Sequence, residues 1–196
     1  MLPLKKVASA ATAGALALTL AIALGTALAT PSLAERTVTV GGAPMYASKN
    51  IIENAVNSKD HTTLVTAVKA AGLVDTLSGA GPFTVFAPTN EAFDKLPGGT
   101  VPMLLKPASK DKLTGILTYH VVAGRWSAED LWKMVDEHGG WAELKTVNGE
   151  TLTIKRLGDK HLAVWDGQGH SARITIPDVM QSNGVIHVID NVMQPG

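Results

Sequence analysis

The chain has 196 residues, and its 17 acidic side chains balance its 17 basic ones. A neutral chain with 5% aromatic residues has neither the basic face nor the stacking surface that nucleic-acid-binding proteins use, so no nucleic-acid partner is expected. Cysteine is absent, which excludes disulfides, thiolate metal ligands, thiol catalysis and an anchor on a lipid-modified cysteine.

The first 34 residues have the features of an export signal. Lys5 and Lys6 are their only charged side chains, and the uncharged stretch that follows is rich in alanine, leucine, threonine and glycine and ends in small residues. This pattern predicts a secretory signal peptide over residues 1–34, cleaved after Ala34 or, alternatively, after Ala29. An uncleaved membrane anchor remains the other interpretation, because about 20 apolar residues can span a bilayer. Under either interpretation we expect an exported protein, periplasmic or extracellular, that contacts a membrane only through this segment.

The sequence predicts a short lead followed by one domain. Residues 35–48 are expected to form an extended lead that Gly41-Gly42 closes, and residues 49–196 contain no linker, repeat or low-complexity stretch. Apolar residues recur at helical spacing in several segments, and Thr89 and Ser127 are placed to cap two helices. The predicted helices cover residues 51–56, 61–71 and 110–120, and two more begin at the capping residues.

The later part of the chain has the pattern of β-strands. Short runs of apolar and β-branched residues bounded by glycine, proline and asparagine are typical of strands. These runs cover residues 83–87, 144–147, 151–154, 161–165, 172–176 and 185–189. Asn148-Gly149 predicts a type I′ turn between two of them, and Pro177 is expected to end the strand before it. Because the helices come mostly before the strands, the pattern indicates an α+β fold.

The chain carries no local motif for catalysis or for a metal ion. None of its six histidines has the spacing of a known metal site. This leaves open only a metal site whose ligands are far apart in the sequence and close together in the fold. His120 lies on the apolar stripe of its predicted helix and His187 lies in an apolar strand, which favours hydrogen-bonded structural roles. The four tryptophans, which are Trp126, Trp132, Trp141 and Trp165, are interpreted either as partly buried or as a sugar-stacking surface. We therefore predict no enzyme activity, no cofactor and no metal.

Three segments together resemble the sequence pattern of fasciclin domains. Residues 81–93 (GPFTVFAPTNEAF) are similar to the first signature of the family, and residues 182–190 (SNGVIHVID) are similar to the second. Between them, residues 117–122 (LTYHVV) resemble the family's tyrosine–histidine motif. The likeness extends from Asn50 to Pro195, and on these motifs the chain is identified as a member of the family.

The resemblance implies a particular α+β fold. Fasciclin domains are wedges of two β-sheets with several helices packed on one side, and the two signatures are expected to be neighbouring central strands. Polar residues within the signatures would then satisfy backbone groups where chain segments meet, because an unpaired buried polar group costs about 1–3 kcal/mol. These residues are Thr84, Thr89, Asn183 and Asp190.

The resemblance also implies a function in adhesion. Fasciclin domains attach cells to other cells or to a matrix, without catalytic residues or an obligatory cofactor, so the expected partner is a cell-surface or matrix protein or glycan. The alternative is an envelope module that binds a small ligand or a glycan and has no adhesion role. The predicted partner-binding residues are Pro177, Asp178, Val179, Met180, Tyr119 and His120.

Two departures from the family pattern bear on the expected partner. Ile176 and Val179 replace the acid and the isoleucine of a string that is implicated in integrin binding in animal members, so an integrin is not the expected receptor. Residues 127–141 add a capped helix with two tryptophans where many relatives have a shorter connection. The sequence leaves open the oligomeric state and whether Asp178 and Val179 are exposed.

Overall fold

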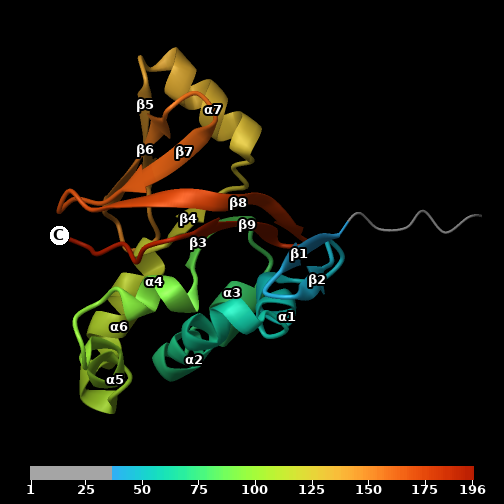
Figure 1. Ribbon diagram of the computed structural model, residues 1–196. Helices are drawn as coiled ribbons and strands as arrows, with labels where there is room; N and C mark the ends of the chain where they lie inside the picture. Colours follow the sequence, from blue (N-terminus) through green and yellow to red (C-terminus); the bar gives the residue numbers. More distant parts are fainter. Residues whose placement is uncertain (1–36) are drawn as a thin grey trace, which may run out of the picture. The chain divides into compact units, whose positions relative to one another are not determined.

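The computed structural model describes residues 37–196 (Figure 1). The predicted export segment, its two cleavage positions and the first two residues of the predicted lead lie outside the described residues. Between residues 37 and 196, no helix is long and apolar enough to cross a membrane.

A seven-stranded sheet organises the described part of the chain. Its strands are β3 (Phe83–Pro88), β4 (Val121–Ala123), β5 (Trp141–Lys145), β6 (Thr151–Leu157), β7 (His161–Trp165), β8 (Ser171–Gln181) and β9 (Gly184–Ile189). They lie in the order β4-β3-β9-β8-β7-β6-β5, and only β3 and β9 are parallel neighbours. The two expected sheets are continuous through β8, which pairs with β7 at its start and with β9 along the rest.

The two signature segments form the central parallel pair of strands. Phe83 lies opposite Gly184, and Pro88 lies opposite Ile189. All six residues of β9 are buried, as expected for a strand covered on both faces. Only a residue without a side chain fits at Gly184, because a Cβ there would come within 2.1 Å of the Phe83 carbonyl oxygen. The prediction that the signatures lie side by side is confirmed.

Asn183 joins three segments of the backbone at the start of β9. Its side-chain oxygen accepts a hydrogen bond from the Ile51 amide at 3.0 Å. Its side-chain nitrogen donates to the carbonyls of Leu77 and Gly79 at 2.8 and 2.7 Å. The other polar residues of the signatures also bond to the backbone, which confirms the structural role expected for them: they are Thr84, Thr89 and Asp190.

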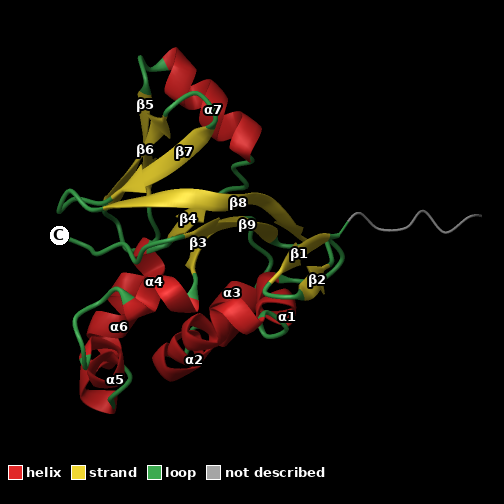
Figure 2. Cartoon of the chain, in the orientation of Figure 1, coloured by secondary structure: helices red, strands yellow, loops and turns green. Residues whose placement is uncertain are grey.

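Helices cover one side of the central strands. In Figure 2 the helices below the sheet are α1 (Ile51–Ala55), α2 (Thr62–Ala71), α3 (Val74–Ser78), α4 (Asn90–Asp94), α5 (Thr100–Leu104) and α6 (Lys110–Tyr119). Short 3-10 turns at Lys59–His61 and Pro107–Ser109 precede α2 and α6. Another helix, α7 (Ala128–Glu137), packs against β5 and β6 instead. One hydrophobic core therefore lies between α1–α6 and the central strands, and a second lies between α7 and the strands β5–β8.

Both predicted helix caps are present. The Thr89 hydroxyl accepts a hydrogen bond from the Ala92 amide at the start of α4. Ser127 and Asp130 form a capping box at the start of α7. One face of α7 buries Leu131 and Val135 completely, so the capped and amphipathic segment folds as the sequence predicted.

The turn between β5 and β6 differs from the predicted type I′ turn. The Thr146 amide donates to the Glu150 carbonyl, and the Gly149 amide donates to the Thr146 carbonyl. With Gly149 at φ 95°, this is a three-residue loop that ends in a glycine bulge. The Asn148 side chain favours the longer loop because its oxygen accepts from the Glu150 amide at 3.0 Å.

The expectation that Pro177 ends its strand is wrong, since β8 continues to Gln181. Pro177 lies in a β-bulge between the pairs Ile176–Val188 and Val179–Ile186, so it faces no register partner. A proline is tolerated at such a position because its missing N–H breaks no bond of the ladder.

The described part of the expected lead is a small hairpin rather than a single extended segment. β1 (Val38–Val40) pairs with β2 (Ala43–Met45) across Gly41-Gly42. Val40 and Met45 are buried in the same core as α1–α6, so these residues pack as part of the folded unit. The alternation of apolar and polar residues indicated the strand, but it did not show what the strand packs against.

Candidate functional site

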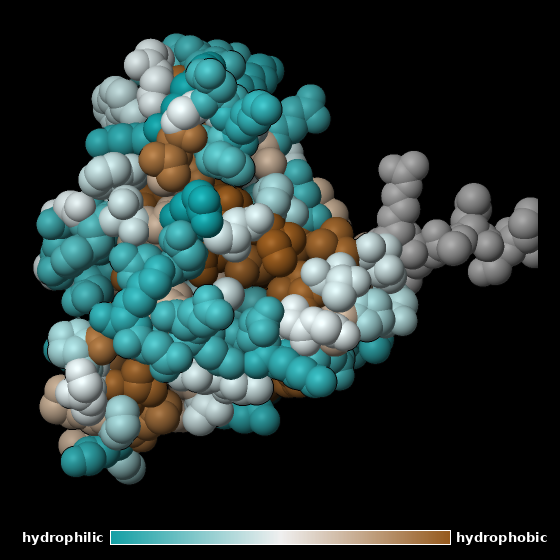
Figure 3. Space-filling view, viewed as in Figure 1, coloured by the Kyte–Doolittle hydropathy of each residue, from teal (hydrophilic) through white to brown (hydrophobic). Residues whose placement is uncertain are grey.

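The predicted Pro-Asp-Val-Met string lies on β8, where the strand bulges. Pro177 is exposed, Asp178 and Met180 are half-buried, and Val179 is 1% exposed. Figure 3 shows apolar surface over this part of β8, between α7 and the β1–β2 hairpin. The apolar residues of β8 that are half-buried in this part are Ile176 and Met180. The string therefore combines accessible residues with one core residue.

Asp178 is held by both its side chain and its backbone. Its φ of 56° lies in the left-handed region, which aspartate tolerates better than most residues. Its Oδ1 accepts a hydrogen bond from the amide of Ala128, the first residue of α7, at 2.7 Å. Its own amide donates to Nδ1 of His187 at 3.3 Å. Contacts from α7 and from β9 therefore fix the bulge, and the helix dipole favours the carboxylate at this end of α7.

His187 connects the bulge to the segment before α7. Because Nδ1 accepts from the Asp178 amide, Nε2 carries the proton and donates to the Trp126 carbonyl at 2.8 Å. The ring is fully buried and stacks on Phe86 with centroids 5.7 Å apart. Burial lowers the pKa of His187, which keeps this neutral tautomer near pH 7. The hydrogen-bonded structural role expected for His187 is confirmed.

Tyr119 lies in the interior at the end of α6. Its hydroxyl donates to the Thr151 carbonyl at 2.9 Å and accepts from the Gly167 amide at 3.1 Å. The residue is 0% exposed, and burial raises the pKa of Tyr119. The hydroxyl thus links α6 to the first residue of β6 and to the loop between β7 and β8.

His120 ties the end of α6 to the C-terminal segment. Nδ1 donates to the Ile116 carbonyl at 2.8 Å, so Nε2 is free of a proton and accepts from the Met193 amide at 3.0 Å. The residue is 3% exposed, and burial lowers the pKa of His120 to about 4. Both ring nitrogens are paired, as expected for a structural histidine.

The structure reveals partners of the string that the sequence did not indicate. Ala128, whose amide binds the Asp178 carboxylate, lies 50 residues earlier in the chain. Trp126, whose carbonyl accepts from His187, lies 61 residues before that histidine. No spacing rule links positions so far apart, and the capping pattern at Ser127 was the one local signal that a helix begins beside them.

Two of the tryptophans have partners that limit their exposure. Trp126 is half-buried, and its indole N–H donates to the Ala123 carbonyl at 3.1 Å. Trp132 of α7 is half-buried, and the Arg156 guanidinium lies over its ring at 5.3 Å. These two rings are therefore engaged within the protein.

The other two tryptophans share an outward face of the strands β5–β7. Trp141 is 48% exposed and lies opposite Lys155, and Trp165 lies opposite Thr153. Because Thr153 and Lys155 are two residues apart on one strand, all four side chains point to the same face. The Lys155 ammonium lies 4.9 Å from the centre of the Trp165 ring.

No metal centre is assembled within residues 37–196, since no group of three or more histidine, aspartate and glutamate side chains is placed to hold an ion. A single carboxylate does lie beside a histidine, because Oδ2 of Asp166 and Nδ1 of His170 are 3.0 Å apart. The Asp166 carboxylate also accepts hydrogen bonds from the amides of Gln168 and Gln194. It therefore stabilises the turn that follows β7 and holds the C-terminal segment against it.

Comparisons with known proteins agree with this geometry. The family model described as Fasciclin domain matches residues 59–195. Protein sll1483 of Synechocystis sp. is 44% identical over 171 residues, which cover 86% of each chain. Immunogenic protein MPB70 of Mycobacterium bovis is 35% identical over 151 residues, covering 72% of this chain and 66% of that protein. Cell surface glycolipoprotein MPB83 of Mycobacterium bovis is 38% identical over 123 residues, covering 63% of this chain and 48% of that protein.

A solved structure shares the fold. The FAS1 domain pair from the insect cell adhesion molecule Fasciclin I matches with a TM-score of 0.58 at 20% sequence identity. The match covers 81% of this chain, and this chain spans 58% of the length of the pair. The predicted α+β fold with helices packed on one side is confirmed. Because the family model also matches most of the chain, this protein belongs to the fasciclin family.

Proposed function

We propose that this protein is an exported, non-enzymatic adhesion module that attaches the cell to another surface through contacts with a protein or a glycan. Membership of the fasciclin family supports the proposal, as does the similarity to a protein named as a cell surface glycolipoprotein. The insect protein that shares the fold is described as a cell adhesion molecule. Adhesion requires an accessible, ordered contact surface rather than a catalytic centre.

The observation that carries the proposal is the fixed bulge on β8. Hydrogen bonds to α7 and β9 hold Asp178, and its neighbour Pro177 is exposed beside it. A surface that is already ordered loses less conformational entropy when it binds a partner. The half-buried Met180 adds apolar area to the same strand. Since the chain has no net charge, binding should rest on such local contacts and depend weakly on salt.

Direct contact with the partner is proposed for only part of the predicted set. Pro177, Asp178 and Met180 reach the surface and can touch a partner. Tyr119 and His120 are buried and hydrogen-bonded, so we propose that they act by supporting the fold beneath the surface. Substitutions at these two positions would then reduce adhesion and stability together.

Attachment of cells that lack the gene and are complemented with variants tests the proposal. Pro177→Lys places a charge on the proposed contact surface, whereas Leu157→Lys places the same charge on β6 at a residue that is 46% exposed. Exposed substitutions usually change stability by less than about 0.5 kcal/mol, so both variants should keep the wild-type melting temperature. We expect weaker attachment only for Pro177→Lys. Equal attachment by both variants, or an unchanged phenotype of the deletion in a strain shown to export the protein, contradicts the proposal.

The alternative function is a glycan-binding module of the envelope. It is favoured by the face that carries Trp141 and Trp165, because aromatic rings beside polar side chains can stack on sugar rings. Tryptophan fluorescence titrated with envelope polysaccharides tests it. A saturable change that Trp141→Ala removes and Trp132→Ala retains would support this function. A flat response with the wild-type protein would exclude it.

A further inference from the structure

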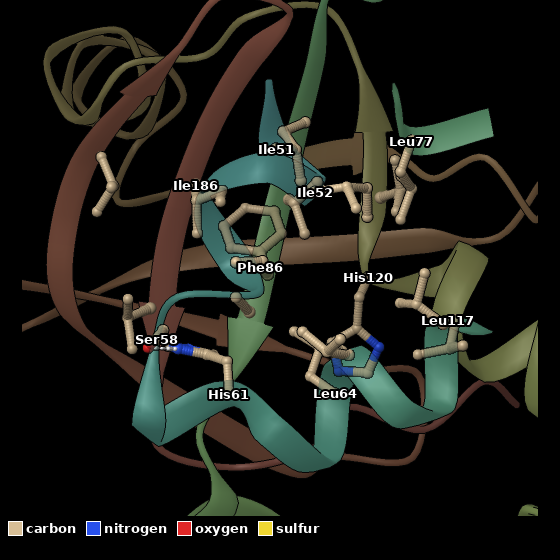
Figure 4. Close-up of a pocket in the computed structure, with 18 of the residues that line it drawn as sticks. Ile51, Ile52, Ser58, His61, Leu64, Leu77, Phe86, Leu117, His120 and Ile186 are labelled. Carbon is tan, nitrogen blue, oxygen red and sulfur yellow. Dashed lines mark hydrogen bonds between the residues drawn. The ribbon is translucent and has the colours of Figure 1, made fainter. Parts of the chain in front are cut away.

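A cavity lies between the helices α1–α3 and the central strands β3 and β9 (Figure 4). Its volume is about 50 Å³, counted as space for the centre of a water-sized sphere. Apolar side chains such as Ile51, Leu64, Leu77 and Ile186 line most of it. Roughly 10–15 Å³ of such space can hold one water molecule, but a buried water also needs 2–4 polar partners. The lining therefore favours apolar contents over water.

The cavity opens between α1 and α2. Several lining residues retain access to solvent there, namely Ile52 and Ala55 of α1 and Val65 and Lys69 of α2. From the buried His61 to Lys69 the chain advances by about 12 Å along α2. The lining residues follow α2 over that length, from His61 to Lys69, so the cavity forms an apolar channel along the helix.

His61 lies at the inner end of this channel and has one unpaired ring nitrogen. The residue is 4% exposed, and its Nδ1 lies 2.8 Å from the Ser58 hydroxyl. Nε2 is buried without a hydrogen-bond partner in the part of the chain that the structure describes. Burial has the larger effect and lowers the pKa of His61, and the Ala87 carbonyl and the Asp60 carboxylate oppose it. The Ala87 carbonyl lies near enough to the ring to raise the pKa of His61, but it does not meet the geometry of a hydrogen bond to Nε2. An uncharged, unpaired nitrogen favours a neutral hydroxyl as its partner over an ion.

We propose that the cavity binds a small amphiphile, whose hydrocarbon chain lies along α2 and whose hydroxyl group hydrogen-bonds to Nε2 of His61. The chain fills space that the apolar lining leaves empty, and the hydroxyl satisfies the unpaired nitrogen. The Ser58 hydroxyl can donate to or accept from Nδ1, so either tautomer of His61 can meet the ligand. The buried Val179 of β8 lines the cavity, but the accessible residues Pro177, Asp178 and Met180 do not, so the proposed site does not depend on the proposed adhesion.

Calorimetric titration of the purified protein with 1-octanol tests the proposal. Ala55→Trp narrows the mouth of the channel, and its matched control is Val56→Trp, at a neighbouring residue that is 49% exposed and outside the lining. We expect saturable binding to the wild type and to Val56→Trp, and its loss in Ala55→Trp. His61→Phe removes the hydrogen-bond partner and should weaken binding at least tenfold.

Each result decides the proposal. No saturable binding to the wild type overturns it, as does wild-type affinity in Ala55→Trp or in folded His61→Phe. Circular dichroism establishes that each variant is folded before titration. If His61→Phe does not fold, chemical-shift changes of the wild-type amides on adding 1-octanol serve instead. Changes centred on the segments that line the cavity, namely α1–α3, β3 and β9, support the site, and changes confined to other segments overturn it.

Discussion

Acidification should destabilise the fold through His120. The pKa of this histidine falls from 6.5 to about 4 in the folded protein, because burial disfavours the charged ring. Between these two values the unfolded chain binds more protons than the folded one. The contribution of His120 to the free energy of unfolding is therefore fully present above pH 6.5 and is lost as the pH drops towards 4. From pH 7.5 to pH 4.5 the loss from this one group is roughly 2–3 kcal/mol. Protonation of Nε2 also removes the acceptor for the Met193 amide.

Urea unfolding at a series of pH values, for the wild type and for His120→Gln, measures this loss. Glutamine does not titrate, so the free energy of unfolding of the variant should fall less on acidification, by about 2–3 kcal/mol. Burial also lowers the pKa of His61 and of His187, and these two groups act equally in both proteins. At pH 7.5 the variant should be less stable by about 1–3 kcal/mol, because Ile116 and Met193 lose their partner. Parallel pH profiles for the two proteins would refute the reasoning.

Two further predictions concern polar residues that hold the scaffold. Asp178→Ala should lower the free energy of unfolding by about 1–3 kcal/mol, since it removes the acceptor for the Ala128 amide and places alanine at φ 56°. Asp178→Asn keeps an acceptor oxygen, so its free energy of unfolding should fall much less. Equal melting temperatures for these two variants would contradict the role given to the carboxylate. Asn183→Ala should cost about 3 kcal/mol or more in urea unfolding, because three backbone groups lose a partner. Asn191→Ala removes an exposed bond to the Ser171 carbonyl and a partly buried one from the adjacent Val192 amide, and it should cost clearly less than Asn183→Ala. Similar losses for these two asparagines would show that burial does not set the cost.

Several features of the fold follow from contacts within a few residues, and the sequence predicted these. The caps at Thr89 and Ser127 depend on a side chain and an amide three positions away. The run from Val185 to Ile189 is apolar at nearly every position, which is the pattern of a strand buried on both faces. The likeness to fasciclin signatures then predicted which two strands meet, and the parallel pairing of β3 with β9 agrees.

The sequence predicted local structure less well at positions where the conformation or the burial of a residue depends on segments that are distant in the chain. Pro177 looked like the end of a strand, but β9 accommodates it at a bulge. Asn148-Gly149 looked like a two-residue turn, but an Asn148 bond to the backbone supports a longer loop. The site residues showed the same limit, because the sequence placed Tyr119 and His120 in a motif without showing that both rings are enclosed.

The sequence by itself determined most of the helices (though not α3 or α5), the strands β3 and β9, the polar residues that join them and the family. Periodicity, capping and turn chemistry act over short stretches, so they can be recognised one segment at a time. The tertiary structure decided which side chains reach solvent: it exposes Pro177, buries Val179, and leaves a cavity that His61 lines. Exposure and cavities arise only when segments far apart in the chain pack together, because each side chain is covered by neighbours that its own sequence context does not specify.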